Sequence, residues 1–217
     1  MKKTYALSFL FLFFLLTANI SHAVQIDIFG TGVDEDGTLT ASGTADAHYS
    51  LIDPNGNTVN PQATVDNPST WVTATSTAQW VTPTGEGSDP VARGNWTYST
   101  TFNMTGLDIS TAIIEGRWAS DNSSEIVLNN QSIKSTDGGD KAFENFTNFS
   151  LNTDYLLSGI NTLVFSVDNA DNGSDNPSGL IVDFTTATAQ VPEPGTLLLL
   201  GSGLAGLAVY RRRMNKA

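Results

Sequence analysis

The sequence predicts an all-β fold, an antiparallel β-sandwich, for the middle of the chain. Apolar and polar side chains alternate in 95–103, 161–169 and 179–185, the period of strands with one buried and one wet face. Clusters rich in Asp, Asn, Gly and Pro, such as 34–37 and 168–179, separate short segments of this kind. About ten short strands without a convincing helix favour two packed sheets, a jelly-roll-like sandwich, over a barrel.

Residues 1–23 predict a secretory signal peptide. Lys2 and Lys3 precede a short apolar stretch, and small residues stand three and one positions before the expected cut after Ala23. The apolar stretch is shorter than the ~20 residues that a membrane span needs, which weighs against a permanent N-terminal anchor. We therefore expect an exported chain that begins at Val24.

Residues 24–186 make up the predicted sandwich domain. The expected strands are 25–29, 38–43, 48–53, 70–74, 79–82, 95–103, 112–119, 124–129, 131–134, 143–151, 161–169 and 179–185. The small polar residues 187–190 follow the last strand and predict a linker.

The domain is strongly acidic and contains no cysteine. Residues 24–190 hold 21 of the 22 Asp and Glu residues and only four bases, which gives a formal charge of −17. Such a charge repels nucleic acid and anionic lipid, so neither is an expected partner. The absence of cysteine excludes disulfides, thiol catalysis and zinc–thiolate sites.

Residues 191–217 predict either a removable sorting segment or a membrane anchor. As a helix, the uncharged stretch 196–210 is about 22 Å long, short of a ~30 Å hydrocarbon core. The arginines that follow are expected to hold this end in the cytoplasm, which places the body outside the inner membrane. The residues of the sorting pattern are Val191, Pro192, Glu193, Pro194, Arg211, Arg212 and Arg213.

This tail resembles the PEP-CTERM sorting signal of bacterial exported proteins. "VPEP", an apolar glycine-bearing segment and "RRR" occur in that order at 191–213. The resemblance implies an exosortase, a membrane cysteine protease that cuts near the Pro-Glu-Pro motif, as a partner. It also implies a diderm bacterium with exopolysaccharide or biofilm machinery. There the chain would be anchored transiently in the inner membrane, with its body in the periplasm, and would then reach the cell surface or extracellular matrix.

The body more loosely resembles galactose-binding-like jelly rolls, the accessory sandwiches of many glycosidases and surface proteins. Asn129 and the Gly159–Asn161 pair match the pattern of that family, whereas Asn130 stands where a glycine is usual. The resemblance implies a scaffold and no specific ligand. The segments that carry it are "EIVLNNQSI" at 125–133, "FENFTNFSL" at 143–151 and "LLSGINTLVFSVDN" at 156–169.

The tryptophans are candidates for the core or for contact with polysaccharide. Trp96 and Trp118 alternate in phase with apolar neighbours, which favours the core. Trp71 and Trp80 lie in a Thr- and Ala-rich segment beside the long loop 83–94. Each of these two is either an exposed platform for a sugar or a buried packing residue.

The acidic loop 168–176 is either a calcium site or a solvated hairpin loop. Dense Asp and Asn residues supply the oxygen ligands that calcium needs, but the same residues dominate turns. The spacing fits no EF-hand, because Ala170 stands where an acidic or amide ligand is required. The predicted ligands are Asp168, Asp171 and Asp175. Calcium is the one cofactor that the sequence suggests.

Catalysis has little support. No G-x-S-x-G motif occurs, and His48 is the one imidazole left after removal of the signal peptide. Glu115 and Glu125, on successive predicted strands, are the pair that a glycosidase would need across a cleft. Arg117 is expected to form an ion pair with a nearby carboxylate, either as a structural contact or in a polar groove.

The sequence therefore predicts a non-enzymatic exported protein of the cell surface or matrix. Sorting through the tail links it to exopolysaccharide and biofilm, with weak, calcium-assisted carbohydrate contact as an added expectation. A small secreted glycoside hydrolase and a dedicated lectin on the same sandwich are the alternatives.

Overall fold

The structure, a computed structural model, describes residues 22–136, 139–170, 176–192 and 196–215. The body, Gln25–Ala189, is one compact unit. The signal peptide prediction falls almost wholly outside the described residues. Ala23, the predicted cleavage position, begins the first strand.

The described residues form twelve strands in two antiparallel sheets. One sheet, the β7–β12 sheet, has the order β10-β7-β12-β5-β4, and β1 also pairs with β12; the other, the β6–β11 sheet, has the order β3-β2-β6-β11-β8-β9. The predicted β-sandwich is thus confirmed. The strands are β1 (Ala23–Gln25), β2 (Ser50–Ile52), β3 (Thr58–Val59), β4 (Gln62–Thr64), β5 (Trp80–Thr82), β6 (Gly94–Asn103), β7 (Asp108–Asp121), β8 (Ser123–Leu128), β9 (Gln131–Ser135), β10 (Thr147–Ser150), β11 (Ile160–Asn169) and β12 (Gly179–Gln190).

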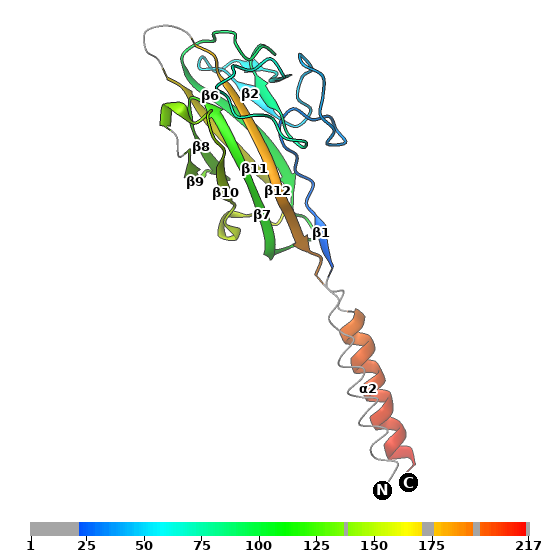
Figure 1. The fold of residues 1–217 in the computed structure, drawn as a ribbon. Coiled ribbons are helices and arrows are strands. Elements are labelled where there is room, and N and C mark those ends of the chain that lie inside the picture. The colour runs from blue at the N-terminus through cyan, green and yellow to red at the C-terminus, as the bar shows by residue number, and fades with distance from the viewer. Residues whose placement is uncertain (1–21, 137–138, 171–175, 193–195, 216–217) are drawn as a thin grey trace. The chain divides into compact units, whose positions relative to one another are not determined.

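The four long strands run along the body, and the loops coloured blue to teal gather at one end of them (Figure 1). Two short 3-10 helices, η1 (Gly139–Lys141) and η2 (Thr153–Tyr155), lie in the connections. The tail contains one helix, α2 (Thr196–Met214).

The main core lies between the sheets. Strands β6 and β11 pair over ten residues, from Ile160 opposite Asn103 to Asn169 opposite Gly94. Their inward side chains meet those of β7 and β12, as the two-residue period predicts. Burial of each large apolar side chain stabilises the fold by about 1.5–3 kcal/mol. Core members from these strands are Trp96, Tyr98, Phe102, Ile114, Trp118, Leu163, Phe165, Val167, Leu180 and Val182.

A second, smaller core covers one part of the outer face of the β7–β12 sheet. Ala119 and Ile181 alternate with the inward residues of β7 and β12, so they lie on the outer face. Trp71, from the loop before β5, packs on them, and the backbone N–H of Val72 donates to the carbonyl oxygen of Phe143 over 2.7 Å. A layer of loop therefore shields the part of this face around Ala119 and Ile181, whereas Ile113, further along β7, is 51% exposed.

Four predictions of local structure were wrong. The predicted strand 25–29 shares only Gln25 with β1, because the chain departs from β12 between Ile26 and Thr31. Residues 70–74 form loop because their apolar side chains pack on the sheet instead of pairing with it. Residues 38–43 make only an isolated bridge, from Leu39 to Val33. The predicted linker 187–190 is the end of β12, because Ala187 and Ala189 are buried in the main core. Small side chains occur both in strands and in loops or linkers, so composition did not distinguish these two kinds of segment.

Gly116 provides a test of how tightly the sheets pack. A Cβ there would lie 2.7 Å from both the carbonyl oxygen of Asp183 and the Phe149 ring. We expect Gly116→Ala to lower the free energy of unfolding by about 1–3 kcal/mol, as overpacking does. Gly159→Ala is the control, since its Cβ would meet nothing within 4 Å. Equal stability of the two variants in urea denaturation would contradict this packing.

Candidate functional site

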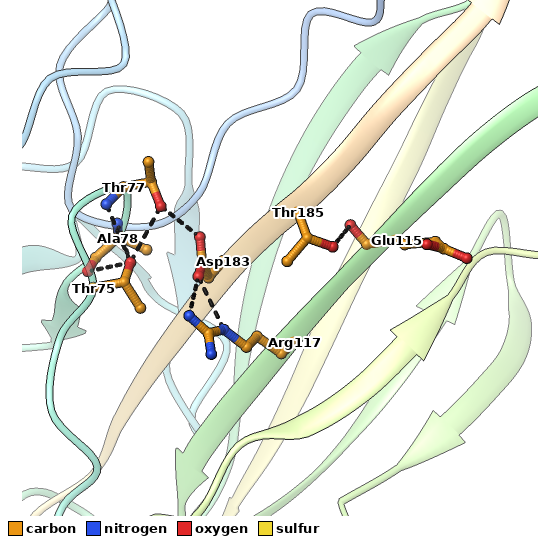
Figure 2. Close-up of polar contacts among 7 residues, drawn as sticks. All are labelled: Thr75, Thr77, Ala78, Glu115, Arg117, Asp183 and Thr185. Carbon is orange, nitrogen blue, oxygen red and sulfur yellow. Dashed lines mark hydrogen bonds and ion pairs between the residues drawn. The ribbon is translucent and has the colours of Figure 1, made fainter.

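Arg117 on β7 and Asp183 on β12 form an ion pair on the outer face of the β7–β12 sheet (Figure 2). The Nε and Nη2 atoms of Arg117 donate to Asp183 Oδ2 over 3.0 and 2.9 Å. Thr77 Oγ1 donates to Asp183 Oδ1 over 2.8 Å. The guanidinium carbon lies 4.6 Å from the centroid of the Phe146 ring. The predicted ion pair of Arg117 is confirmed, and the buried carboxylate, which the sequence analysis missed, is its partner.

This pair fastens the loop between β4 and β5, residues 65–79, to the sheet. We call this segment the covering loop. The side chain of Asp183 is 5% exposed, against 39% for Arg117. Three donors reach the carboxylate, and the Thr77 that supplies one of them sits in a turn closed by Thr75 Oγ1, which accepts from Ala78 N. A buried carboxylate that accepts three hydrogen bonds in this way has a structural role. Its sequence signal was a single acid within the apolar run 179–185.

Trp71 and Trp80 are buried packing residues, the second of the two alternatives that the sequence left open. Trp71 is 6% exposed and Trp80 is fully buried, and their ring centroids lie 4.2 Å apart. Trp80 Nε1 donates to the Val72 carbonyl oxygen over 2.8 Å. Both rings belong to the smaller core because the covering loop, which sequence alternation could not reveal, folds over them.

Asp121, at the end of β7, is a buried carboxyl beside this core. Trp71 Nε1 donates to its Oδ2 over 3.0 Å, and Ser178 Oγ donates to its backbone carbonyl over 2.8 Å. Burial raises the pKa of the Asp121 carboxyl to about 7, and the hydrogen bond from Trp71 opposes the rise. This group therefore couples the covering loop to pH.

The carboxylates considered for glycoside hydrolysis lie on opposite sides of the sandwich. Glu115 alternates with the inward residues Ile114 and Gly116 on β7, and Figure 2 shows its side chain pointing away from the Arg117–Asp183 pair. Glu125 alternates with inward residues on β8, in the other sheet. With both sheets between them, these two carboxyl groups cannot flank one glycosidic bond.

His48 stabilises a loop near the N-terminal end of the body. Its Nε2 lies 2.7 Å from the Asp34 carbonyl oxygen, and its ring stacks on Phe29 with centroids 4.0 Å apart. The buried Asp46 accepts hydrogen bonds from the backbone N–H groups of Gly32, His48 and Tyr49. These contacts give the imidazole and the carboxylate structural roles.

The predicted calcium ligands are only partly described. Asp168 is exposed on β11, whereas Asp171 and Asp175 lie outside the described residues. Within the described part of the chain, no three His, Asp or Glu side chains form a group that could hold a metal ion. The calcium site stays a prediction.

A polar groove of about 410 Å³ crosses the outer face of the β6–β11 sheet. Its lining includes Asn95 from β6, Ser166 and Asp168 from β11, and Ser123 and Glu125 from β8. Ser166 opposes Glu125 across the sheet, and Asp168 opposes both Asn95 and Ser123. Ser166 Oγ donates to Asn95 Oδ1 over 2.9 Å. The sequence alone does not reveal this groove, although the polar residues that alternate along the predicted strand 95–103 indicate the face on which it lies.

A second groove, of about 420 Å³, lies between residues 25–30 and β12. It opens where the N-terminal segment bows away from β12 between two contacts, Ile26 N to Ala187 O at 2.8 Å and Thr31 N to Val182 O at 3.0 Å. Its lining mixes apolar residues with threonines. The groove exists because the residues between Ile26 and Thr31 do not pair with β12.

The tail has the layout that the sequence predicts, as far as it is described. Val191 and Pro192 precede α2, while Glu193 and Pro194 lie outside the described residues. Arg211, Arg212 and Arg213 occupy the last turn of α2, where positive charge is favourable. In the described ranges, no helix combines the length and the apolar character needed to cross a membrane. The expected transmembrane helix of residues 191–217 is not confirmed.

Residues 190–213 match the model of the PEP-CTERM protein-sorting motif. The tail thus carries this sorting motif, which implies export, processing by an exosortase and sorting to the cell surface. No curated protein matches the chain.

Several solved structures are distantly similar to the body. An FMN-binding β-glucuronidase from Facaelibacterium prausnitzii L2-6 is 18% identical, with 62% of this chain and 21% of that one covered and a TM-score of 0.35. A family 35 carbohydrate binding module from an environmental isolate is 16% identical, with 50% and 80% covered and a TM-score of 0.29. The carbohydrate-binding module CBM36, in complex with calcium and xylotriose, is 17% identical, with 44% and 74% covered and a TM-score of 0.28. The chain thus spans about a fifth of the glucuronidase, and likeness at this level carries no argument about ligand or activity.

Removal of the Arg117 guanidinium should destabilise the fold, because Asp183 is buried and loses its cationic partner. We expect Arg117→Met to lower the free energy of unfolding by about 3 kcal/mol, because the buried Asp183 carboxylate then keeps the hydrogen bond from Thr77 but has no positive charge beside it. Lys141→Met is the control, since its pair with Glu144 is exposed and contributes at most about 1 kcal/mol. Chemical denaturation measures both, and equal losses would contradict the structural role of the pair.

Asp121 should make the fold less stable as pH rises. Its folded-state pKa of about 7 exceeds the ordinary value of 3.8, so the native state binds the proton more tightly. The stabilisation is present below about pH 4 and is lost as pH rises through about 7, a change of about 2–4 kcal/mol. Asp121→Asn keeps an acceptor for Trp71, and its stability in urea denaturation should not fall in this way between about pH 4 and pH 7. The control Asp154→Asn changes an exposed carboxyl and should keep the pH-dependent loss of stability. An unchanged pH dependence in Asp121→Asn would show that another group causes the loss.

Proposed function

We propose that the chain is a non-enzymatic exported protein of the cell surface or extracellular matrix. The sorting motif at 190–213 carries this proposal, because its match assigns the chain to an exosortase-dependent export route. The tail then acts as a temporary address, with the apolar segment of α2 associating with the inner membrane while the body lies in the periplasm. Exosortase cleavage near Pro192–Pro194 releases the body to the surface or matrix.

The character of the body supports a structural or adhesive role there. Its two sheets bury a continuous core, and its formal charge of −17 favours solubility outside the cell. Glu115 and Glu125, the carboxylates considered for hydrolysis, are held apart, and His48 is engaged in a loop. These observations favour a structural or adhesive protein over a glycoside hydrolase.

Fractionation of cells with and without the exosortase tests the proposal. In the parent strain we expect a chain shortened near the Pro-Glu-Pro motif in the surface or matrix fraction. Without the exosortase, the full tail should remain and the chain should stay in the cell envelope. Mass spectrometry of the mature C-terminus distinguishes the two forms.

A variant of the motif makes the same test within one strain. Replacement of Pro192, Glu193 and Pro194 by alanine should block shortening, whereas Ser202→Ala in α2 should leave it intact. A shortened chain in the exosortase-deficient strain would contradict the sorting route.

A further inference from the structure

The outer face of the β6–β11 sheet is rich in hydroxyl and amide groups and poor in charge. On the wet faces of β6, β8 and β11, only Glu125 and Asp168 are charged, although the body carries a formal charge of −17. Hydroxyl and amide side chains both donate and accept hydrogen bonds, as sugar hydroxyls do. The outward residues of these strands are Asn95, Thr97, Ser99, Thr101, Asn103, Ser123, Glu125, Val127, Ile160, Thr162, Val164, Ser166 and Asp168.

Both charged residues lie in the polar groove, close to each other. Ser166 opposes Glu125 directly, and Asp168 is two residues further along β11, so the two carboxylates are diagonal neighbours. Diagonal neighbours on one face have Cα atoms about 7–8 Å apart, and their side chains can reach nearer. One sugar residue in the groove therefore lies within reach of both carboxylates. Ser132 Oγ donates to Glu125 Oε1 and helps to fix its position.

The groove is negative and is not neutralised from its own walls. No basic residue is among the described residues that line it. Arg117 pairs with Asp183, Lys141 pairs with Glu144, and Lys134 Nζ donates to the Asn148 carbonyl oxygen on the other sheet. Arg93, two residues before Asn95, also has an interaction partner and is not among the residues that line the groove. The complementary ligand bears positive charge within a hydroxyl-rich chain. An ammonium group, with three donors, matches two carboxylates and the surrounding oxygens.

We propose that this groove binds a polysaccharide that carries free amino groups. The ammonium of an amino sugar lies between Glu125 and Asp168, and its hydroxyl groups bond to the Ser, Thr and Asn side chains along β6 and β11. Glycans rich in uronic acid are repelled by the acidic body, and N-acetylated chains lack the charge that the groove takes. This inference rests on the proposed surface location for its biological setting, but the contact itself does not require the sorting tail.

Titration calorimetry of the purified chain with defined oligosaccharides tests the proposal. The probes are the hexamers of β-1,4-linked glucosamine and of N-acetylglucosamine, at a pH where the amines are protonated. We expect binding of the first and little or none of the second. Binding should weaken as salt is raised, since an exposed ion pair is screened. Equal affinity for both probes, or calcium binding in the groove without glucosamine binding, would overturn the proposal.

Matched variants separate the groove from the general charge of the body. Glu125→Gln with Asp168→Asn should weaken glucosamine binding at least about tenfold, equivalent to about 1.4 kcal/mol. Glu35→Gln with Asp154→Asn makes the same charge change at exposed positions outside the groove, and should keep the affinity within about twofold. Equal losses in the two double variants would reduce the effect to non-specific attraction and refute the groove.

A further variant keeps the test valid if the double change disturbs the fold. Asn95→Lys places a cation at the exposed edge of the groove and should abolish binding while melting stays cooperative. Unchanged binding in this variant would also refute the groove. If the chain is sorted normally to the surface but does not bind glucosamine, the groove proposal is wrong and the proposed function stands. If the chain binds glucosamine but is never exported, the proposed function is wrong and the groove proposal stands.

Discussion

Packing between the two sheets is the constraint on which the rest of the structure depends. The alternate side chains of β6 and β11 meet those of β7 and β12, and this contact decides which residues face water. Trp118 adds a polar link, because its Nε1 donates over 2.8 Å to Ser124 Oγ on β8 of the opposite sheet. Since the chain has no cysteine, this core holds the body together without covalent crosslinks.

The two outer faces then have different roles. Part of the outer face of the β7–β12 sheet is covered by a loop that Trp71 and the Arg117–Asp183 pair hold in place. The outer face of the β6–β11 sheet carries a polar groove. Both sheets have outward side chains, but only the β7–β12 sheet has a second apolar layer packed on them. The proposed ligand site therefore lies on the β6–β11 sheet, where the polar side chains of the groove remain accessible.

Much of the fold was predictable from the sequence, and less of the site. The alternation in 95–103, 161–169 and 179–185 predicted β6, β11 and β12, because apolar residues of these strands point into the main core at every second position. In β12 the outward Ile181 and Asp183 are buried as well, beneath the loop before β5, and the alternation did not reveal this. Trp71 and Trp80 could be read either way, since burial by a covering loop depends on contacts distant in the chain. The partner of Arg117 was beyond prediction for the same reason: Asp183 is 66 residues away. The tail was the part most easily predicted from the sequence, because its motif consists of residues that are close together in the chain.

We infer that the body meets its ligand on the polar outer face of the β6–β11 sheet, and not on the face beneath the loop before β5. Amide chemical-shift mapping of the chain with the glucosamine hexamer distinguishes the two faces. We expect shifts concentrated at Asn95, Ser123–Glu125 and Ser166–Asp168. Shifts concentrated instead around Trp71 and Phe146, on the covered face, would contradict it.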